Sequence, residues 1–148
     1  MLNEKLSYAT TRTTYAFAAP HKTLTSYEQL RLALRAGDQV IAVVDVDKCV
    51  ASHPTETKLP GAAAGFNFDV FDNYKVQTNY KAQMTIATAF THVTQHSKFG
   101  FVQDYVRLRI FEDNSAEIMS AYLNPQTFVP YYTVSYACQV GEGVLLYA

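Results

Sequence analysis

The pattern of apolar and polar positions predicts one helix near the start of the chain. Its apolar residues recur at helical spacing and so share one face: Tyr27, Leu30 and Leu34. Thr25 and Glu28 form a capping box, and Gly37 supplies the left-handed residue that commonly ends a helix. We therefore expect an amphipathic helix over residues 26–36 that packs on a sheet.

After this helix, the pattern is that of β-strands. Residues 40–46 form a nearly continuous apolar run, which is typical of a strand covered on both faces. Alternating positions, or β-branched and aromatic residues, predict further strands at 66–70, 79–93, 102–110, 116–123, 133–140 and 144–147. Asp113 and Asn114 fit a tight hairpin turn.

Strands joined by short turns pair antiparallel, because parallel neighbours need long crossovers. The predicted fold class is α+β and mostly β, with the N-terminal helix packed on a curved antiparallel sheet of six or seven strands. Such a sheet must protect its edges, either by curling toward a barrel or by using the helix as a cover.

The length fits a single domain over residues 24–148, preceded by a flexible tail over residues 1–23. The tail has no charged start followed by a 7–15-residue apolar stretch, so we do not expect it to be an intact signal peptide. A net charge of −1 argues against a nucleic-acid partner, and no apolar run is long enough to span a membrane.

Two pairs of residues raise the question of a metal or acid–base site. His92 and His96 have the spacing of zinc ligands on a helix, but in an extended strand that spacing separates them by about 13 Å. Asp45 and Asp47 could hold a divalent ion, yet acids at the end of a strand are more often solvated or paired with a nearby lysine such as Lys48. We expect no metal site.

Arg107 and Arg109 share one face of a predicted strand with Tyr105. Two guanidiniums about 7 Å apart on one pleat could hold a carboxylate or phosphate. The alternative is a solvent-facing surface whose charge discourages edge pairing and contributes little to stability. No known catalytic fingerprint is present, so we expect no catalytic residue and no cofactor.

Several stretches together resemble the VirK family of small bacterial proteins, whose biochemical function is unsettled. They are Tyr27–Leu30 with Leu34, "GDQVIAVVDVDKC" over residues 37–49, "YVRLRIFED" over 105–113, "LNPQTF" over 123–128 and Tyr136–Cys138. The resemblance covers the chain from about Thr25 onward. It implies a virulence-associated protein that is exported to the periplasm or secreted, and it supplies no catalytic residues.

An exported chain meets an oxidising compartment, so with this resemblance we expect Cys49 and Cys138 to form a disulfide. The alternative is two separate buried thiols. The functional hypothesis is an exported, non-enzymatic domain that binds an unknown protein or small ligand. The alternative is a small-ligand carrier or enzyme that uses the mouth of a barrel-like sheet, with Arg107 and Arg109 as an anion clamp.

Overall fold

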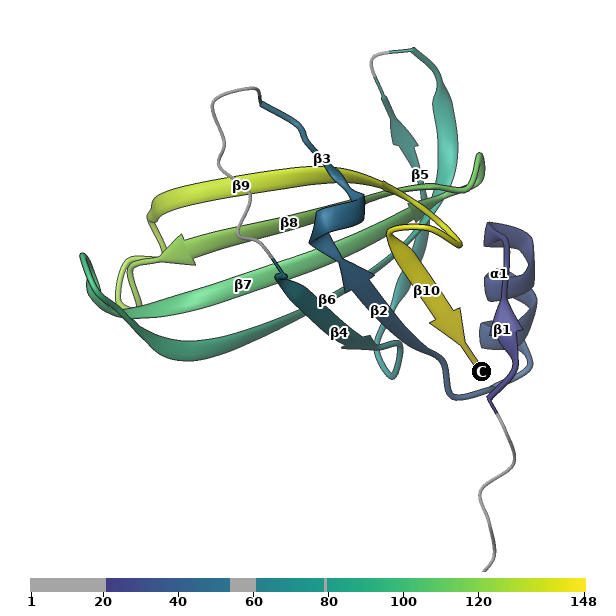
Figure 1. The fold of residues 1–148 in the computed structure, drawn as a ribbon, viewed down its shortest axis with the longest axis horizontal. Coiled ribbons are helices and arrows are strands. Elements are labelled where there is room, and N and C mark those ends of the chain that lie inside the picture. Colours follow the sequence, from purple (N-terminus) through teal and green to yellow (C-terminus); the bar gives the residue numbers. More distant parts are fainter. Residues whose placement is uncertain (1–20, 54–60, 79) are drawn as a thin grey trace, which may run out of the picture.

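The described residues fold into two antiparallel sheets and one α-helix (Figure 1). The computed structural model describes residues 21–53, 61–78 and 80–148; most of the predicted tail, residues 1–20, lies outside this part. The four-stranded sheet has the order β1 (Thr23–Leu24), β10 (Val144–Tyr147), β2 (Ile41–Asp45) and β4 (Ala63–Asn67). The six-stranded sheet has the order β3 (Val50–Ala51), β9 (Pro130–Gln139), β8 (Ser115–Leu123), β7 (Gly100–Phe111), β6 (Ala82–His96) and β5 (Asp72–Gln77).

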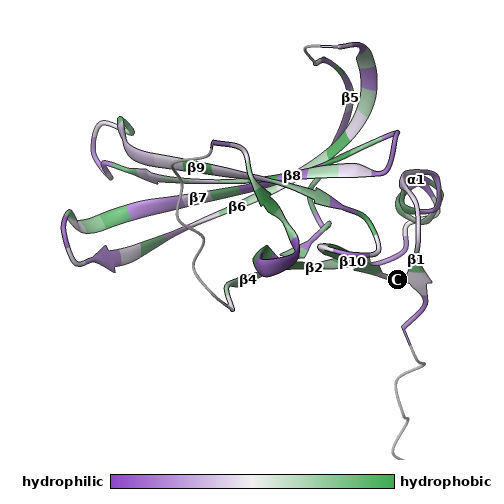
Figure 2. Ribbon diagram, turned by 45° about the horizontal axis from the view of Figure 1, so that its top comes forward, coloured by the Kyte–Doolittle hydropathy of each residue, from purple (hydrophilic) through white to green (hydrophobic). Residues whose placement is uncertain are grey.

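The fold class is confirmed as mostly β, but the expectation of one curved sheet is wrong. The described strands form two sheets that pack face to face, and they do not close into a barrel. The predicted strand over residues 40–46 also differs, because β2 is covered on one face only. Val44 is fully buried, whereas Val43 is 39% exposed. The reason is that the helix does not cover this strand: it lies at one end of the sandwich (Figures 1 and 2).

Helix α1 (Tyr27–Arg35) buries the predicted face, including Tyr27, Leu30 and Leu34. Its cap lies one residue later than predicted. Ser26 is the N-cap and accepts a hydrogen bond from the backbone N–H of Gln29, while the Gln29 side chain accepts one from the backbone N–H of Thr25. The cap therefore forms from Ser26 and Gln29, and it differs from a standard capping box because the Gln29 side chain bonds the residue before the N-cap.

The N-terminus of α1 is held by the hairpin turn between β7 and β8. Asn114 occupies this turn with a left-handed backbone, at φ 68°. Its side-chain Oδ1 accepts a hydrogen bond of 2.7 Å from the backbone N–H of Tyr27. Asparagine tolerates this conformation better than most residues, and the same side chain satisfies a helix donor that lacks an intrahelical partner.

The main core fills the space between the two sheets and the helix. Three alternate residues of β7 point into it and are buried: Val106, Leu108 and Ile110. Val44, Val144 and Leu146 of the four-stranded sheet are buried in the same cluster. The chain segment before α1 joins this sheet, since Lys22 and Ala148 exchange backbone hydrogen bonds of 2.8 Å. Within the described residues, no helix has the length and apolarity needed to cross a bilayer.

Candidate functional site

The register of β7 places Tyr105, Arg107 and Arg109 on the face of the six-stranded sheet that points away from the four-stranded sheet. They alternate with the buried residues of β7, so the shared face predicted from the sequence is confirmed. The side chains of Arg107 and Arg109 are only 25% and 20% exposed, so they differ from the freely solvated charges of the solvent-facing alternative. We call this surface the outer face.

Two features shield these arginines. On β6, small residues lie opposite both arginines and leave room for long side chains, since Ala89 pairs with Arg107 and Ala87 with Arg109. In addition, β5 and the adjoining part of β6 rise out of the plane of β7–β9, away from β2 and β10 (Figure 2). Gln83 and Phe111 are consequently buried although they belong to the outer face.

The outer face contains two hollows. The smaller, of about 270 Å³, is lined by Arg107, Tyr105 and Tyr74 together with the segment that leads into β5. We call it the arginine hollow. The larger hollow, of about 560 Å³, lies between β3 and the hairpin of β5 and the adjoining part of β6, which we call the raised hairpin. Gln83 and Glu117 contribute to its lining. We call it the glutamine hollow.

Glu117 joins the two hollows by pairing with both arginines. Its Oε1 accepts a hydrogen bond of 3.1 Å from Arg107 and lies 3.5 Å from Nε of Arg109. Two positive charges thus share one carboxylate oxygen. The Nε atoms of both arginines are buried and have no hydrogen-bond partner in the described structure. A guanidinium carries five N–H donors and Glu117 engages one nitrogen of each arginine, so terminal N–H groups are left for an anionic ligand.

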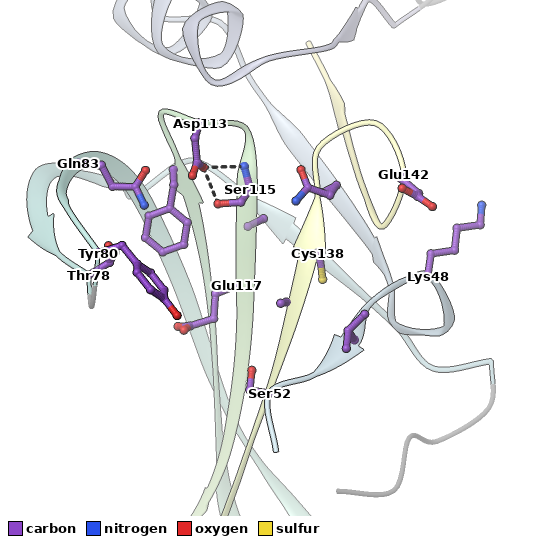
Figure 3. A pocket seen from close by; sticks show the side chains of 15 residues that line it. Lys48, Ser52, Thr78, Tyr80, Gln83, Asp113, Ser115, Glu117, Cys138 and Glu142 are labelled. Carbon is purple, nitrogen blue, oxygen red and sulfur yellow. Dashed lines mark hydrogen bonds between the residues drawn. The ribbon is translucent and has the colours of Figure 1, made fainter. Parts of the chain in front are cut away.

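The glutamine hollow contains one acid whose hydrogen bonds are already made (Figure 3). Asp113 accepts two hydrogen bonds from Ser115, and its Oδ2 lies 3.8 Å from Nζ of Lys81. Burial acts to raise the pKa of Asp113, but the bonds from Ser115 and the charge of Lys81 outweigh it, so that the pKa is lowered. Asp113 therefore stabilises the turn between β7 and β8.

Gln83 has no such partners. Its side chain is 95% buried, and its Oε1 has no hydrogen-bond partner in the described structure. In Figure 3, the Gln83 amide points into the hollow toward Asp113. Buried polar atoms are nearly always hydrogen-bonded in native proteins, so an unpaired one at the wall of a hollow calls for an explanation.

The remaining polar residues singled out in the sequence have structural contacts. Asp45 accepts a hydrogen bond from the backbone N–H of Asp47 at the start of the short helix η1 (Val46–Lys48), and Asp47 accepts one from Gly61. His92 lies 3.8 Å from Asp104. Nδ1 of His96 accepts a bond from the backbone N–H of Lys98. Within the part of the chain that the structure describes, no three potential ligands gather into a metal site.

Cys49 and Cys138 form a disulfide, as expected, with their Cα atoms 4.6 Å apart. Cys49 lies between η1 and β3, and Cys138 belongs to β9, the strand that pairs with β3, so the bond fixes the chain to β9 where it passes from the four-stranded to the six-stranded sheet. Both residues are buried, with exposed fractions of 1% and 3%. Gly143 packs directly against the bond, because a Cβ on this residue would lie 2.7 Å from Sγ of Cys49.

Comparison with known proteins agrees with the resemblance read from the sequence. The family model described as VirK protein matches residues 23–128. The chain belongs to the VirK family. A solved VirK family protein, lpg1832 from Legionella pneumophila, shares the fold with a TM-score of 0.68 at 16% identity, over 85% of this chain and 98% of that one. No curated protein matches the chain. VirK membership thus establishes the fold and assigns no activity to the outer face.

Sequence reasoning missed two residues of the site, Glu117 and Gln83. Glu117 pairs across the hairpin with Arg109, and a correct register for the turn between β7 and β8 would have predicted this contact. Gln83 lies in the predicted strand over residues 79–93, but its burial depends on the raised hairpin. No local pattern around Gln83 indicates that the hairpin bends toward the outer face.

Proposed function

We propose that this VirK protein is an exported, non-enzymatic binding domain that holds an anionic ligand on its outer face, with Arg107 and Arg109 as the anion contacts and Tyr105 beside them. The observation that carries the proposal is the sharing of one Glu117 oxygen by two half-buried guanidiniums. Arginine stays protonated in proteins, so the pair can hold an anion but cannot exchange protons with it. This favours binding over acid–base catalysis.

Burial strengthens such a site. Salt screens exposed charges over roughly 10 Å at 0.1 M ionic strength but screens partly buried pairs much less. The side chains of Arg107 and Arg109 are 75–80% buried. A carboxylate or phosphate could therefore compete with water for the free N–H groups. On this proposal the anion clamp lies on the outer face of an open sheet rather than in the mouth of a barrel, because the described strands do not close into a barrel.

The cellular part of the proposal depends on the disulfide and the family. A buried disulfide between distant parts of the chain is typical of proteins that fold in an oxidising compartment, which supports a periplasmic or secreted location. The virulence association implied by VirK membership belongs to this proposal as well. The ligand could be a free small molecule or an acidic group on a partner protein, since both present the same anion chemistry.

The test is an NMR titration of ¹⁵N-labelled protein with inorganic phosphate and with succinate, monitored at the Nε–H signals of Arg107 and Arg109. We expect saturable shifts at both arginines that exceed those caused by chloride at equal ionic strength. The R107Q/R109Q variant should bind at least tenfold more weakly. R35Q is the matched control, because Arg35 lies on α1 and not on the outer face and is not paired with Glu117. Equal affinity in all three proteins would contradict the proposal.

A further inference from the structure

The unpaired Gln83 oxygen indicates which chemical group the ligand has at the end away from the arginines. Gln83 is 95% buried, lies in a strand and lines the larger hollow, yet Oε1 has no hydrogen-bond partner among the described residues. Leaving a buried acceptor unpaired costs free energy in the unliganded protein. A ligand that donates an N–H to this oxygen would remove that cost, and the acceptor therefore selects a donor-bearing ligand.

The neighbouring acids reinforce this selectivity. Glu117 also lines the glutamine hollow, and only its Oε1 is engaged by the arginines. Glu142 contributes a further carboxylate to the lining, against one lysine, Lys48. Asp113 is already hydrogen-bonded to Ser115. The hollow thus offers carboxylate and amide oxygens as acceptors, which suit an amino group or a row of amide N–H groups.

The two hollows meet at one ion pair. Glu117 lines the glutamine hollow, Arg107 lines the arginine hollow, and the two side chains are 3.1 Å apart. Along β6, Gln83 precedes Ala87, the residue opposite Arg109, by four positions. Four extended residues span about 13 Å. A ligand that reaches both the arginines and Gln83 must therefore be roughly as long as four residues of extended peptide.

We infer that the outer face binds a short peptide-like zwitterion, with a carboxylate on Arg107 and Arg109 and its amino end toward Gln83. This inference rests on the proposed function, because it takes the anion contact at the arginines as given. It adds the class of ligand, the direction in which the ligand lies and its length. Gln83 contributes selectivity for the amino end.

The probes for this test are tetraglycine, N-acetyl-tetraglycine and tetraglycine amide, titrated against ¹⁵N-labelled protein. Tetraglycine should bind at least fivefold more tightly than either blocked form and should shift the side-chain NH₂ signals of Gln83. The Q83L variant should lose the preference for tetraglycine over its N-acetyl form but still bind the N-acetyl form. Its melting temperature should stay equal or rise, because leucine removes an unpaired buried acceptor.

The control variant is Q103L, since Gln103 lies on the same face but lines neither hollow. It should retain the full preference. Equal binding of tetraglycine and N-acetyl-tetraglycine to the native protein would overturn the inference while leaving the arginine site intact. A native protein that binds phosphate but neither tetraglycine nor N-acetyl-tetraglycine would also overturn the inference and leave the arginine site intact. Loss of arginine-dependent binding for every probe would instead contradict the proposed function. If Q83L does not fold, the side-chain NH₂ signals of Gln83 in the native protein provide the test: they should shift with tetraglycine, and no shift would contradict the inference.

Discussion

Removing the disulfide should destabilise the domain by a large part of its total stability. The bond joins residues 89 positions apart, so it closes most of the folded chain into one loop. The chain-entropy model gives about 4.6 kcal/mol for a loop of this length, at the upper end of what disulfides contribute. A domain is typically stable by only about 5–15 kcal/mol. At roughly 2–4 °C for each kcal/mol, the melting temperature should fall by about 10–18 °C.

The assay is urea denaturation of three proteins: oxidised native protein, reduced native protein and the C49A/C138A variant. The reduced protein keeps both sulfur atoms, so its difference from the oxidised protein isolates the cross-link. The difference between the reduced protein and the variant then measures packing, which should be a smaller loss because only two sulfur atoms are removed from the core. A cross-link contribution below about 1 kcal/mol would refute the reasoning, because it would mean that the reduced unfolded chain is already restricted.

Three further changes test other parts of the structure. Leu34 is 7% exposed, so L34A should cost about 2–5 kcal/mol in urea denaturation; a loss below about 0.5 kcal/mol would mean that this helix face is not packed. G143A places a methyl group 2.7 Å from Sγ of Cys49 and should cost about 1–3 kcal/mol by the same measurement, whereas no loss would show that the loop moves freely. The pKa of Asp113 is lowered in the folded protein, so its ionised carboxylate stabilises the fold at pH values above the ordinary aspartate pKa, and this stabilisation is lost as the pH falls through the lowered pKa. The melting temperature of D113N should therefore change less between pH 5 and pH 3 than that of the native protein; identical pH profiles would contradict this assignment.

Local patterns predicted the elements whose sequence determines them directly. The apolar face of α1 and the alternation along β7 are properties of a single segment, and the structure confirms both. The predicted N-cap of α1, Thr25, differs by one residue from the observed N-cap, Ser26, because both residues have a hydroxyl group that can cap a helix. Sequence alone does not say which of two neighbouring hydroxyls caps a helix, since that depends on where the backbone leaves the extended conformation.

The pairing across the β7–β8 hairpin shows why the site was only half predicted. A two-residue turn at Asp113 and Asn114 would place Arg109 opposite Ile118. The observed turn spans Glu112–Asn114, which shifts the register by one and places Glu117 opposite Arg109. A shift of one residue exchanges the two faces of a strand, so one turn decides whether the arginines meet a carboxylate or an apolar side chain.

The division into two sheets depends on contacts between distant segments. β2 pairs with β10 and β4, and no local pattern specifies these partners. β5 was missed entirely, because its residues, such as Asn73 and Lys75, lack a strong apolar alternation. Since β5 and β6 form the raised hairpin, missing β5 also meant missing the glutamine hollow.

The place of β10 in the four-stranded sheet has a consequence for the timing of folding. β10 is the most C-terminal of the described strands, yet it lies between β1 and β2. At roughly 5–20 residues per second, it leaves the ribosome about 5–20 s after β2. During that interval, β1 has no strand to pair with, and Val44 and Leu24 have no partner from Val144 or Leu146 to cover them. Synthesis therefore passes through a stage in which the apolar side chains of β1 and β2 are exposed, and the incompletely folded chain is then accessible to a chaperone or a translocation machine.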